Sequence, residues 1–225
     1  MENKVKIFEF KGIKAMVRKD TSDEFVVKEV MGGAYNKLNI LKTDTVLDIG
    51  LNIGMFTCFA LKRGASFVSS YEPEEQNFKL AKYNINLNGF KDKSKLNNKA
   101  VIGNNDKHRI FSINLKRNKG AHSLIEKRGR NAVFVECCNI NEVLKEVKPS
   151  VVKIDCEGGE YEILKAVKSF KGIREMIMEF HHAHLNDKNY SKHKEIVALL
   201  EKHFKKVVYN NNPKGAWVTP IYCKK

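Results

Sequence analysis

The chain has 225 residues and carries 41 Lys and Arg against 26 Asp and Glu, a formal net charge of +15. A chain of this length can bury a full hydrophobic core, so we expect one catalytic-sized domain with a small N-terminal addition. The sequence has neither a long apolar run nor a basic-then-apolar leader, which excludes a predicted membrane span or secretory signal and favours a cytoplasmic location.

The N-terminal addition is expected over residues 1–42. Two short alternating segments surround Gly12 and predict a hairpin. Thr21 opens a T-S-D-E stretch, a capping-box pattern with Glu24, and apolar residues at helical spacing predict a helix over 23–38. The main domain is expected over 43–225.

From Thr45 onward the sequence alternates between strand and helix patterns. Strands are expected at 45–50, 66–73, 151–155 and 175–180, helices at 53–64, 75–89, 139–147, 159–167 and 189–204, extended segments at 95–102, 108–113 and 132–137, and a closing hairpin over 206–223. The alternation predicts an α/β fold with a mostly parallel central sheet, helices on both faces and a C-terminal antiparallel hairpin. Ligands in such folds bind at the carboxyl ends of the strands, where the winding reverses.

The stretch VLDIGLNIGMF, residues 46–56, places a glycine turn where a strand ends and a helix begins. Glycine permits backbone paths that other residues avoid and lets a ligand approach the main chain. The spacing of Gly50 and Gly54 departs from G-x-G-x-x-G, and no Gly-Lys-Ser/Thr follows. Dinucleotide and triphosphate binding are therefore disfavoured, although a plain strand-to-helix connection is also consistent with the pattern.

The next strand ends in Tyr71, Glu72 and Pro73. Glu72 follows the glycine turn by about twenty residues, the distance at which an acid in a β-α-β unit accepts hydrogen bonds from both ribose hydroxyls. We therefore interpret Glu72 as a nucleoside ligand.

These features resemble the FkbM-type group of Rossmann-like S-adenosylmethionine (SAM)-dependent methyltransferases. The resemblance rests on VLDIGLNIGMFT (46–57), YEPEEQNFKLAKYNINLNG (71–89), KGAHSL (119–124), VVKIDCEGGEYEILKAV (151–167) and MEFH (178–181). It implies a Rossmann-like methyltransferase domain that uses SAM and releases S-adenosylhomocysteine. The residues that it implies as cofactor contacts are Asp48, Gly50, Asn52, Gly54 and Glu72. Leu51 stands where that family usually has a small residue, which implies a differently shaped pocket wall.

The segment KIDCEGGE places Asp155, Glu157 and Glu160 around a Gly-Gly helix start. An acid at that position can simply cap the helix, which is one reading of Glu160. Methyl transfer to a hydroxyl requires a group that takes the proton, and Asp155 and Glu157 are candidates. His181 is a third candidate, because His181 and His182 point to opposite faces of a strand and His181 falls in the family block.

The same acids suggest a second interpretation. Asp155, Glu157, Glu179 and His181 lie on neighbouring strand ends and could bind a divalent cation, although their spacing is not diagnostic and no metal is predicted. The five cysteines form no CxxC pair, and the vicinal Cys137 and Cys138 are expected to be packed in the core.

The net charge is concentrated between Lys107 and Arg130, where eight Lys or Arg face one acid, Glu126. We expect this segment to orient an anionic acceptor, although a solvated surface is the alternative. The predicted acceptor-binding residues are Lys116, Arg117, Lys119, Arg128 and Arg130, with His122 and Ser123, which the resemblance places near the mouth of the active site.

The resemblance implies O-methylation of a sugar or another polar metabolite, but it does not identify the acceptor. The net charge keeps an RNA methyltransferase open, although no block for holding a flipped base and no added RNA-binding module is visible. A SAM-binding subunit without catalysis that serves a partner is a third reading. An NAD-dependent oxidoreductase is a more distant one.

Overall fold

The structure is a computed structural model that describes residues 5–113, 124, 131–182, 185, 187, 190–210 and 216–225. Its strands are β1 (Val5–Phe10), β2 (Ile13–Arg18), β3 (Thr45–Ile49), β4 (Phe67–Tyr71), β5 (Ser94–Asn97), β6 (Ala100–Ile102), β7 (His108–Ile113), β8 (Asn131–Asn139), β9 (Val151–Ile154), β10 (Glu175–His181), β11 (Lys206–Val208) and β12 (Val218–Lys224). Its helices are α1 (Asp23–Glu29), the π-helix η1 (Val30–Ala34), α2 (Met55–Lys62), α3 (Glu75–Leu87), the short η2 (Lys91–Lys93), α4 (Ile140–Val147), α5 (Glu160–Ala166) and α6 (Ser191–Glu201). The predicted order of strands and helices is confirmed, except that the single extended segment predicted over 95–102 is two strands, β5 and β6.

The centre of the described chain is a seven-stranded sheet in the order β11-β12-β10-β9-β3-β4-β5. The strands from β10 to β5 pair in parallel, and β12 and β11 join the β10 edge antiparallel. This arrangement confirms the mostly parallel sheet and the C-terminal antiparallel hairpin. The strand order reverses between β3 and β9, so the carboxyl ends of these two strands mark the switch point where such folds bind ligands.

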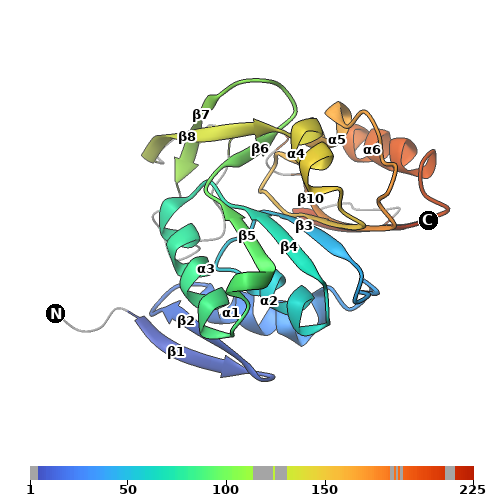
Figure 1. Cartoon of the computed structure of the whole chain (residues 1–225). Coiled ribbons are helices and arrows are strands. Elements are labelled where there is room, and N and C mark those ends of the chain that lie inside the picture. Colours follow the sequence, from blue (N-terminus) through green and yellow to red (C-terminus); the bar gives the residue numbers. More distant parts are fainter. Residues whose placement is uncertain are drawn as a thin grey trace.

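Helices cover both faces of the sheet (Figure 1). Successive strand residues point to opposite faces, so Val46 packs with α1, α2 and α3 while Leu47 packs with α4, α5 and α6. In the same way, Val151 of β9 packs in the first core and Val152 in the second. The parallel strands are therefore packed between two apolar cores, and this packing fixes the positions of the ends of β3, β4 and β9. None of the helices in the described ranges has the length and apolar character that a membrane span requires.

The N-terminal hairpin packs on helix α3. Its strand β2 buries alternate residues in the core that also holds α1 and α2. The side-chain amides of Asn84 and Asn88 bond the backbone of β2 at Met16 and Lys14. These bonds satisfy the outer edge of β2, whose other edge pairs with β1.

The start of α1 differs from the predicted capping box, which is wrong. The helix begins at Asp23, one residue later than a Thr21 cap requires, and the Thr21 hydroxyl donates to the carbonyl of Arg18. Glu24 instead forms an ion pair with Lys6. The helical stretch also ends at Ala34 and not at residue 38, because Gly33 adopts a φ of 136°.

A smaller three-stranded sheet of β6, β8 and β7 lies above α3 and the β5 edge of the main sheet (Figure 1). The sequence predicted its extended segments but not their separation from the central sheet. Cys137 is buried here and Cys138 is half-buried, both as free thiols, which agrees with packing.

Candidate active site

A cavity of about 230 Å³ lies at the carboxyl ends of β3, β4 and β9, near the roughly 300 Å³ at which small-molecule pockets begin. One end is formed by the residues after β3 and β4 together with Phe111 and Leu124. The other end is formed by the residues after β9 and by Glu179 of β10, with Glu29, Tyr35 and Phe56 from the helices below. The cavity thus lies at the predicted switch point.

The glycine turn is shaped by the protein's own backbone. Gly50 has a φ of 86°, and a Cβ at this position would lie 1.7 Å from the carbonyl oxygen of Asp155. Gly54, with a φ of 91°, lies against Ala81 of α3. Gly50 and Asn52 line the cavity, whereas Gly54 is not part of its wall. The close approach that Gly50 permits is therefore between β3 and β9.

Asp48 is fully buried behind this turn and does not line the cavity. Its carboxylate accepts a hydrogen bond from Thr57 at 2.9 Å and lies 3.2 Å from the Lys153 ammonium. Burial raises the pKa of Asp48, and Lys153 and Thr57 oppose that rise. Asp48 is thus an internal partner of Lys153, and its predicted contact with a cofactor stays a prediction.

Lys153 is the residue that sequence reasoning missed. It is 3% exposed, donates to the Gly50 carbonyl at 2.6 Å, and lies 3.7 Å from Asp155. Burial alone lowers the pKa of Lys153, but the charges of Asp48 and Asp155 outweigh it and raise the pKa. A lysine inside the apolar strand VVKI was the available signal, because a buried ammonium requires anionic partners.

Glu72 lines the opposite end of the cavity and is held by backbone donors. The amides of Asn52 and Glu74 donate to its two carboxylate oxygens at 2.8 and 2.9 Å. Burial raises the pKa of Glu72 to about 7, and these two hydrogen bonds limit the rise. Asn52 presents its amide from a left-handed conformation with a φ of 52°. The turn after β3 therefore orients the acid after β4.

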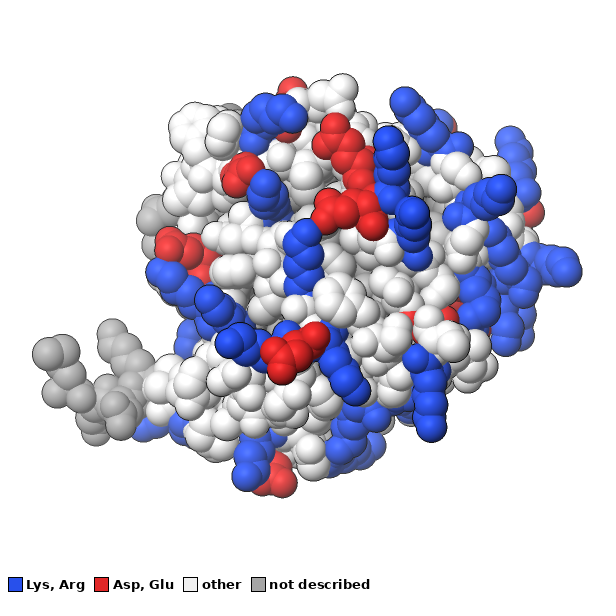
Figure 2. Space-filling view, viewed as in Figure 1, with Lys and Arg blue, Asp and Glu red and all other residues white. Residues whose placement is uncertain are grey.

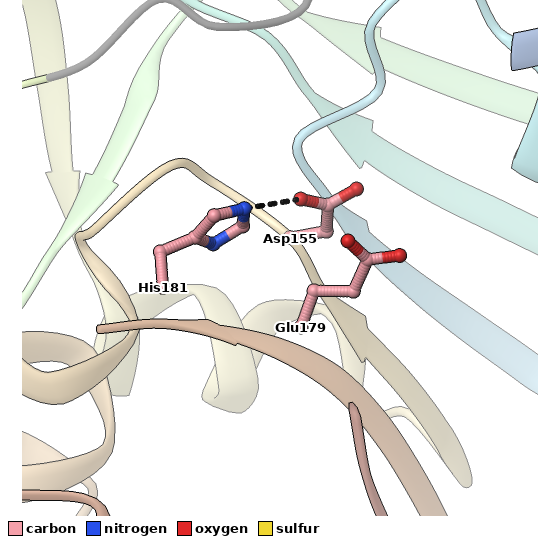
Figure 3. A group of neighbouring side chains, drawn as sticks. All are labelled: Asp155, Glu179 and His181. Carbon is pink, nitrogen blue, oxygen red and sulfur yellow. Dashed lines mark ion pairs between the residues drawn. The ribbon is translucent and has the colours of Figure 1, made fainter. Parts of the chain in front are cut away.

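His181 and four acids gather at the other end. His181 Nδ1 lies 3.0 Å from Glu160 Oε1, and Nε2 lies 3.9 Å from Asp155 Oδ1 and 3.7 Å from Glu157 Oε2. In Figure 3 the His181 ring and the carboxylates of Asp155 and Glu179 converge on one point. The structure thus brings together all three residues predicted to serve the chemistry.

The charges of this group control its protonation. Burial lowers the pKa of His181, but the hydrogen bond with Glu160 and the charges of Asp155 and Glu157 raise it to about 10. Burial raises the pKa of Glu160, yet His181 and the amides of Gly158 and Cys156 lower it overall. The charge of Asp155 and burial raise the pKa of Glu179 to about 8. These shifts favour the imidazolium form of His181 and the protonated form of Glu179 near neutral pH, which leaves Asp155 and Glu157 as the candidate proton acceptors of the group.

His182 belongs to a separate cluster, as the alternation along β10 predicted. Its Nε2 lies 2.7 Å from the Thr219 hydroxyl, and its ring packs against His193 and Tyr190. Burial lowers the pKa of His182, opposite to the shift of its neighbour. His182 packs in the fold away from the cavity.

The predicted acceptor-binding residues Lys116, Arg117, Lys119, His122, Ser123, Arg128 and Arg130 lie outside the described residues. Their contribution to the site stays a prediction. Glu160, which the sequence also allowed as a helix cap, does accept backbone hydrogen bonds from Cys156 and Gly158 near the start of α5. Its contact with His181 was not foreseen.

Comparison with known proteins identifies the family. The model of the methyltransferase FkbM domain matches residues 48–207. The chain belongs to the FkbM methyltransferase family. The match includes the glycine turn, Glu72 and the Asp155, Glu157 and His181 group, and it supports methyl transfer as the class of activity. No curated protein matches the sequence.

Solved structures support the same fold at low sequence identity. Putative transferase PH0793 from Pyrococcus horikoshii is 14% identical with a TM-score of 0.53, over 100% of this chain and 74% of that one. TYW2 of P. horikoshii in complex with MeSAdo is 14% identical with a TM-score of 0.52, over 99% and 70%. The tRNA (uracil-54, C5)-methyltransferase of Pyrococcus abyssi, in complex with S-adenosyl-L-homocysteine, is 11% identical with a TM-score of 0.51, over 100% and 45%. These likenesses confirm a Rossmann-like methyltransferase fold.

Proposed function

We propose that this FkbM-family protein is a SAM-dependent methyltransferase that methylates a hydroxyl of a sugar or a related polar metabolite. The proposal rests on one observation. Glu72, Asp155 and Glu157 line the same cavity, and His181 lies next to Asp155 and Glu157. A nucleoside-binding acid at one end and proton-accepting carboxylates at the other are what a methyl donor and a hydroxyl acceptor require.

The residues of the cavity fit the cofactor. Each Glu72 oxygen accepts one backbone N–H and keeps a lone pair for a ribose hydroxyl. Phe111, Val101 and Leu124 provide apolar surface beside Glu72 for the adenine. SAM supplies a methyl group already activated by its sulfonium. Two solved structures with this fold hold MeSAdo or S-adenosyl-L-homocysteine, which supports the assignment.

The chain's own residues then align and deprotonate the acceptor. Asp155 and Glu157 flank the protonated His181, so a carboxylate can take the proton of a bound hydroxyl while the imidazolium balances the charge. Lys153 fixes Asp155 relative to the glycine turn through its bond to Gly50. The geometry therefore ties the cofactor turn to the acceptor side, which favours alignment as the main source of rate.

An RNA acceptor is the second candidate because of the net charge of +15. Figure 2 shows Lys and Arg side chains spread over the viewed face, interspersed with acids, and not gathered in one groove. A nucleic-acid site usually presents a concentrated basic stripe. The described part of the viewed face presents no such stripe, and the basic residues between Lys116 and Arg130 lie outside the described residues.

The proposal is tested by incubating the protein with deuterium-labelled methyl SAM and separate panels of sugars, polar metabolites and bulk tRNA. We expect a labelled O-methyl product among the small molecules. We also expect Asp155→Asn or Glu157→Gln to lower transfer by about 100-fold while SAM affinity changes little. Labelled tRNA would instead establish the RNA candidate. Tight SAM binding without any transfer, together with a stable partner in pull-downs, would support a non-catalytic subunit.

A further inference from the structure

Three possible metal-ligand atoms meet at the His181 end of the cavity. A carboxylate oxygen of Asp155, one of Glu179 and a ring nitrogen of His181 all lie within 4.8 Å of one another (Figure 3). A divalent cation with ligands at roughly 2.0–2.6 Å separates its ligand atoms by about 3–5 Å. The three atoms are therefore close enough to surround one cation.

The orientation of His181 is fixed in the manner of a metal ligand. Its Nδ1 bonds Glu160, and Nε2 faces Asp155. A ligating histidine almost always bonds its second nitrogen to a carboxylate, a carbonyl or water. Glu160 is 0% exposed and also accepts hydrogen bonds from Cys156 and Gly158, so it cannot turn away.

Glu179 gives the second reason to expect a cation. Within the described part of the chain its carboxylate, which is mostly withdrawn from solvent, has neither a hydrogen bond nor an ion pair. The charges of Asp155 and Glu29 repel it, and the opposing charges of His181 and Lys153 are shared with other acids. Asp155, Glu160 and Glu179 thus gather around one imidazole, and because burying such a surplus of carboxylates is costly, this end of the cavity favours a bound positive charge.

We propose that Asp155, Glu179 and His181 bind a divalent cation of the magnesium or manganese kind, whose charge replaces that of the imidazolium because the ligating ring nitrogen of His181 gives up its proton. Carboxylates favour these cations, and one imidazole is compatible with Mn²⁺. Three protein ligands leave about three octahedral positions for water and acceptor oxygens. The class of acceptor that this site suits carries two neighbouring hydroxyls, as a sugar ring does.

The role of the cation rests on the proposed function, although the binding site does not. The cation lowers the pKa of the acceptor hydroxyl, and Glu157, next to His181, accepts the proton. The acceptor oxygen then forms a bond to the methyl carbon while the carbon–sulfur bond breaks. The bonding pair stays on sulfur, so the products are a methyl ether, neutral S-adenosylhomocysteine and one proton.

The test measures Mn²⁺ binding to the full chain, by the loss of the free-ion electron paramagnetic resonance signal. We expect the wild-type protein to bind one Mn²⁺ that Mg²⁺ displaces, and Glu179→Gln to weaken it by about tenfold or more. Glu29→Gln is the matched control, because it neutralises another carboxylate of the same cavity outside the ligand set. It should change the Mn²⁺ affinity by less than about threefold.

Equal weakening by both variants would overturn the ligand assignment, and so would the absence of a Mn²⁺ site in the wild-type protein. The wild-type result decides the question even if Glu179→Gln fails to fold. SAM binding measured in EDTA separates this inference from the proposed function. If the protein binds SAM but no Mn²⁺, the cation site is wrong and the proposed function stands. If it binds neither SAM nor Mn²⁺, the proposed function is contradicted as well.

Discussion

The two ends of the cavity are organised by different parts of the chain. At the Glu72 end, backbone amides of Asn52 and Glu74 hold one carboxylate. At the His181 end, side chains from β9, β10 and α5 hold one another, with His181 Nδ1 3.0 Å from Glu160. The first arrangement depends on turn conformation, and the second on the identity of side chains.

This difference separates recognition from chemistry. Backbone donors carry no titratable charge, so they hold Glu72 in one position for the same cofactor in each reaction, although the carboxyl group itself titrates. A network of ionisable side chains can exchange protons and cations, which suits the acceptor side. Gly50 and Lys153 connect the two ends, because both contact the backbone or side chain of Asp155.

The largest loss of stability is expected from Gly50→Ala, because Gly50 lies where the two ends of the cavity meet. The new Cβ would lie 1.7 Å from the Asp155 carbonyl oxygen, so β3 and β9 would have to separate. We expect the free energy of unfolding to fall by about 4 kcal/mol or more in urea titrations. Gly89→Ala is the control, since its φ of 74° is similar but its Cβ meets no atom within 4 Å. It should cost about 1–2 kcal/mol, and equal losses would contradict the close-approach argument.

Lys153→Met should have the next largest effect. It leaves Asp48 buried without its cationic partner, 3.2 Å away in the wild-type protein. Breaking such a pair costs about 3–5 kcal/mol. The double variant with Asp48→Asn should recover part of the loss, because the uncompensated charge is removed as well. An additive double variant in urea unfolding would show that the two side chains are not coupled.

Titration of the Glu72 carboxyl group is expected to have a smaller effect, on both stability and SAM affinity. Its pKa is raised from 4.5 to about 7, so the native state retains a proton that the unfolded chain has lost between those values. Its contribution to stability is therefore greatest below pH 4.5 and declines as pH rises to 7. Because the proposed ribose contact uses both Glu72 oxygens as acceptors, SAM affinity should rise about tenfold from pH 6 to pH 8. In Glu72→Gln this rise should disappear; its persistence would assign the pH dependence to another group.

The sequence predicted the Glu72 end better than the His181 end for a physical reason. A glycine turn and an acid at the next strand end belong to one β-α-β unit, so their local order implies their proximity. The contacts of Glu160 with His181 and of Asp48 with Lys153 join distant segments and arise only when β3, β9 and β10 pair. The sequence grouped Asp155, Glu157 and His181 because all three follow strands, but it did not indicate their buried partners.

The most direct test of the account is calorimetric titration of SAM and S-adenosylhomocysteine into the wild-type protein, Glu72→Ala and the control Glu75→Ala, with NAD as a competitor. Glu75 is exposed and pairs only with Lys79 among the described residues. We predict that both ligands bind the wild-type protein, that Glu72→Ala weakens binding by about 1–3 kcal/mol, and that Glu75→Ala and NAD have no effect. Absence of SAM binding to the wild-type protein, or equal affinities in Glu72→Ala and Glu75→Ala, would contradict the assignment of this cavity to the methyl donor.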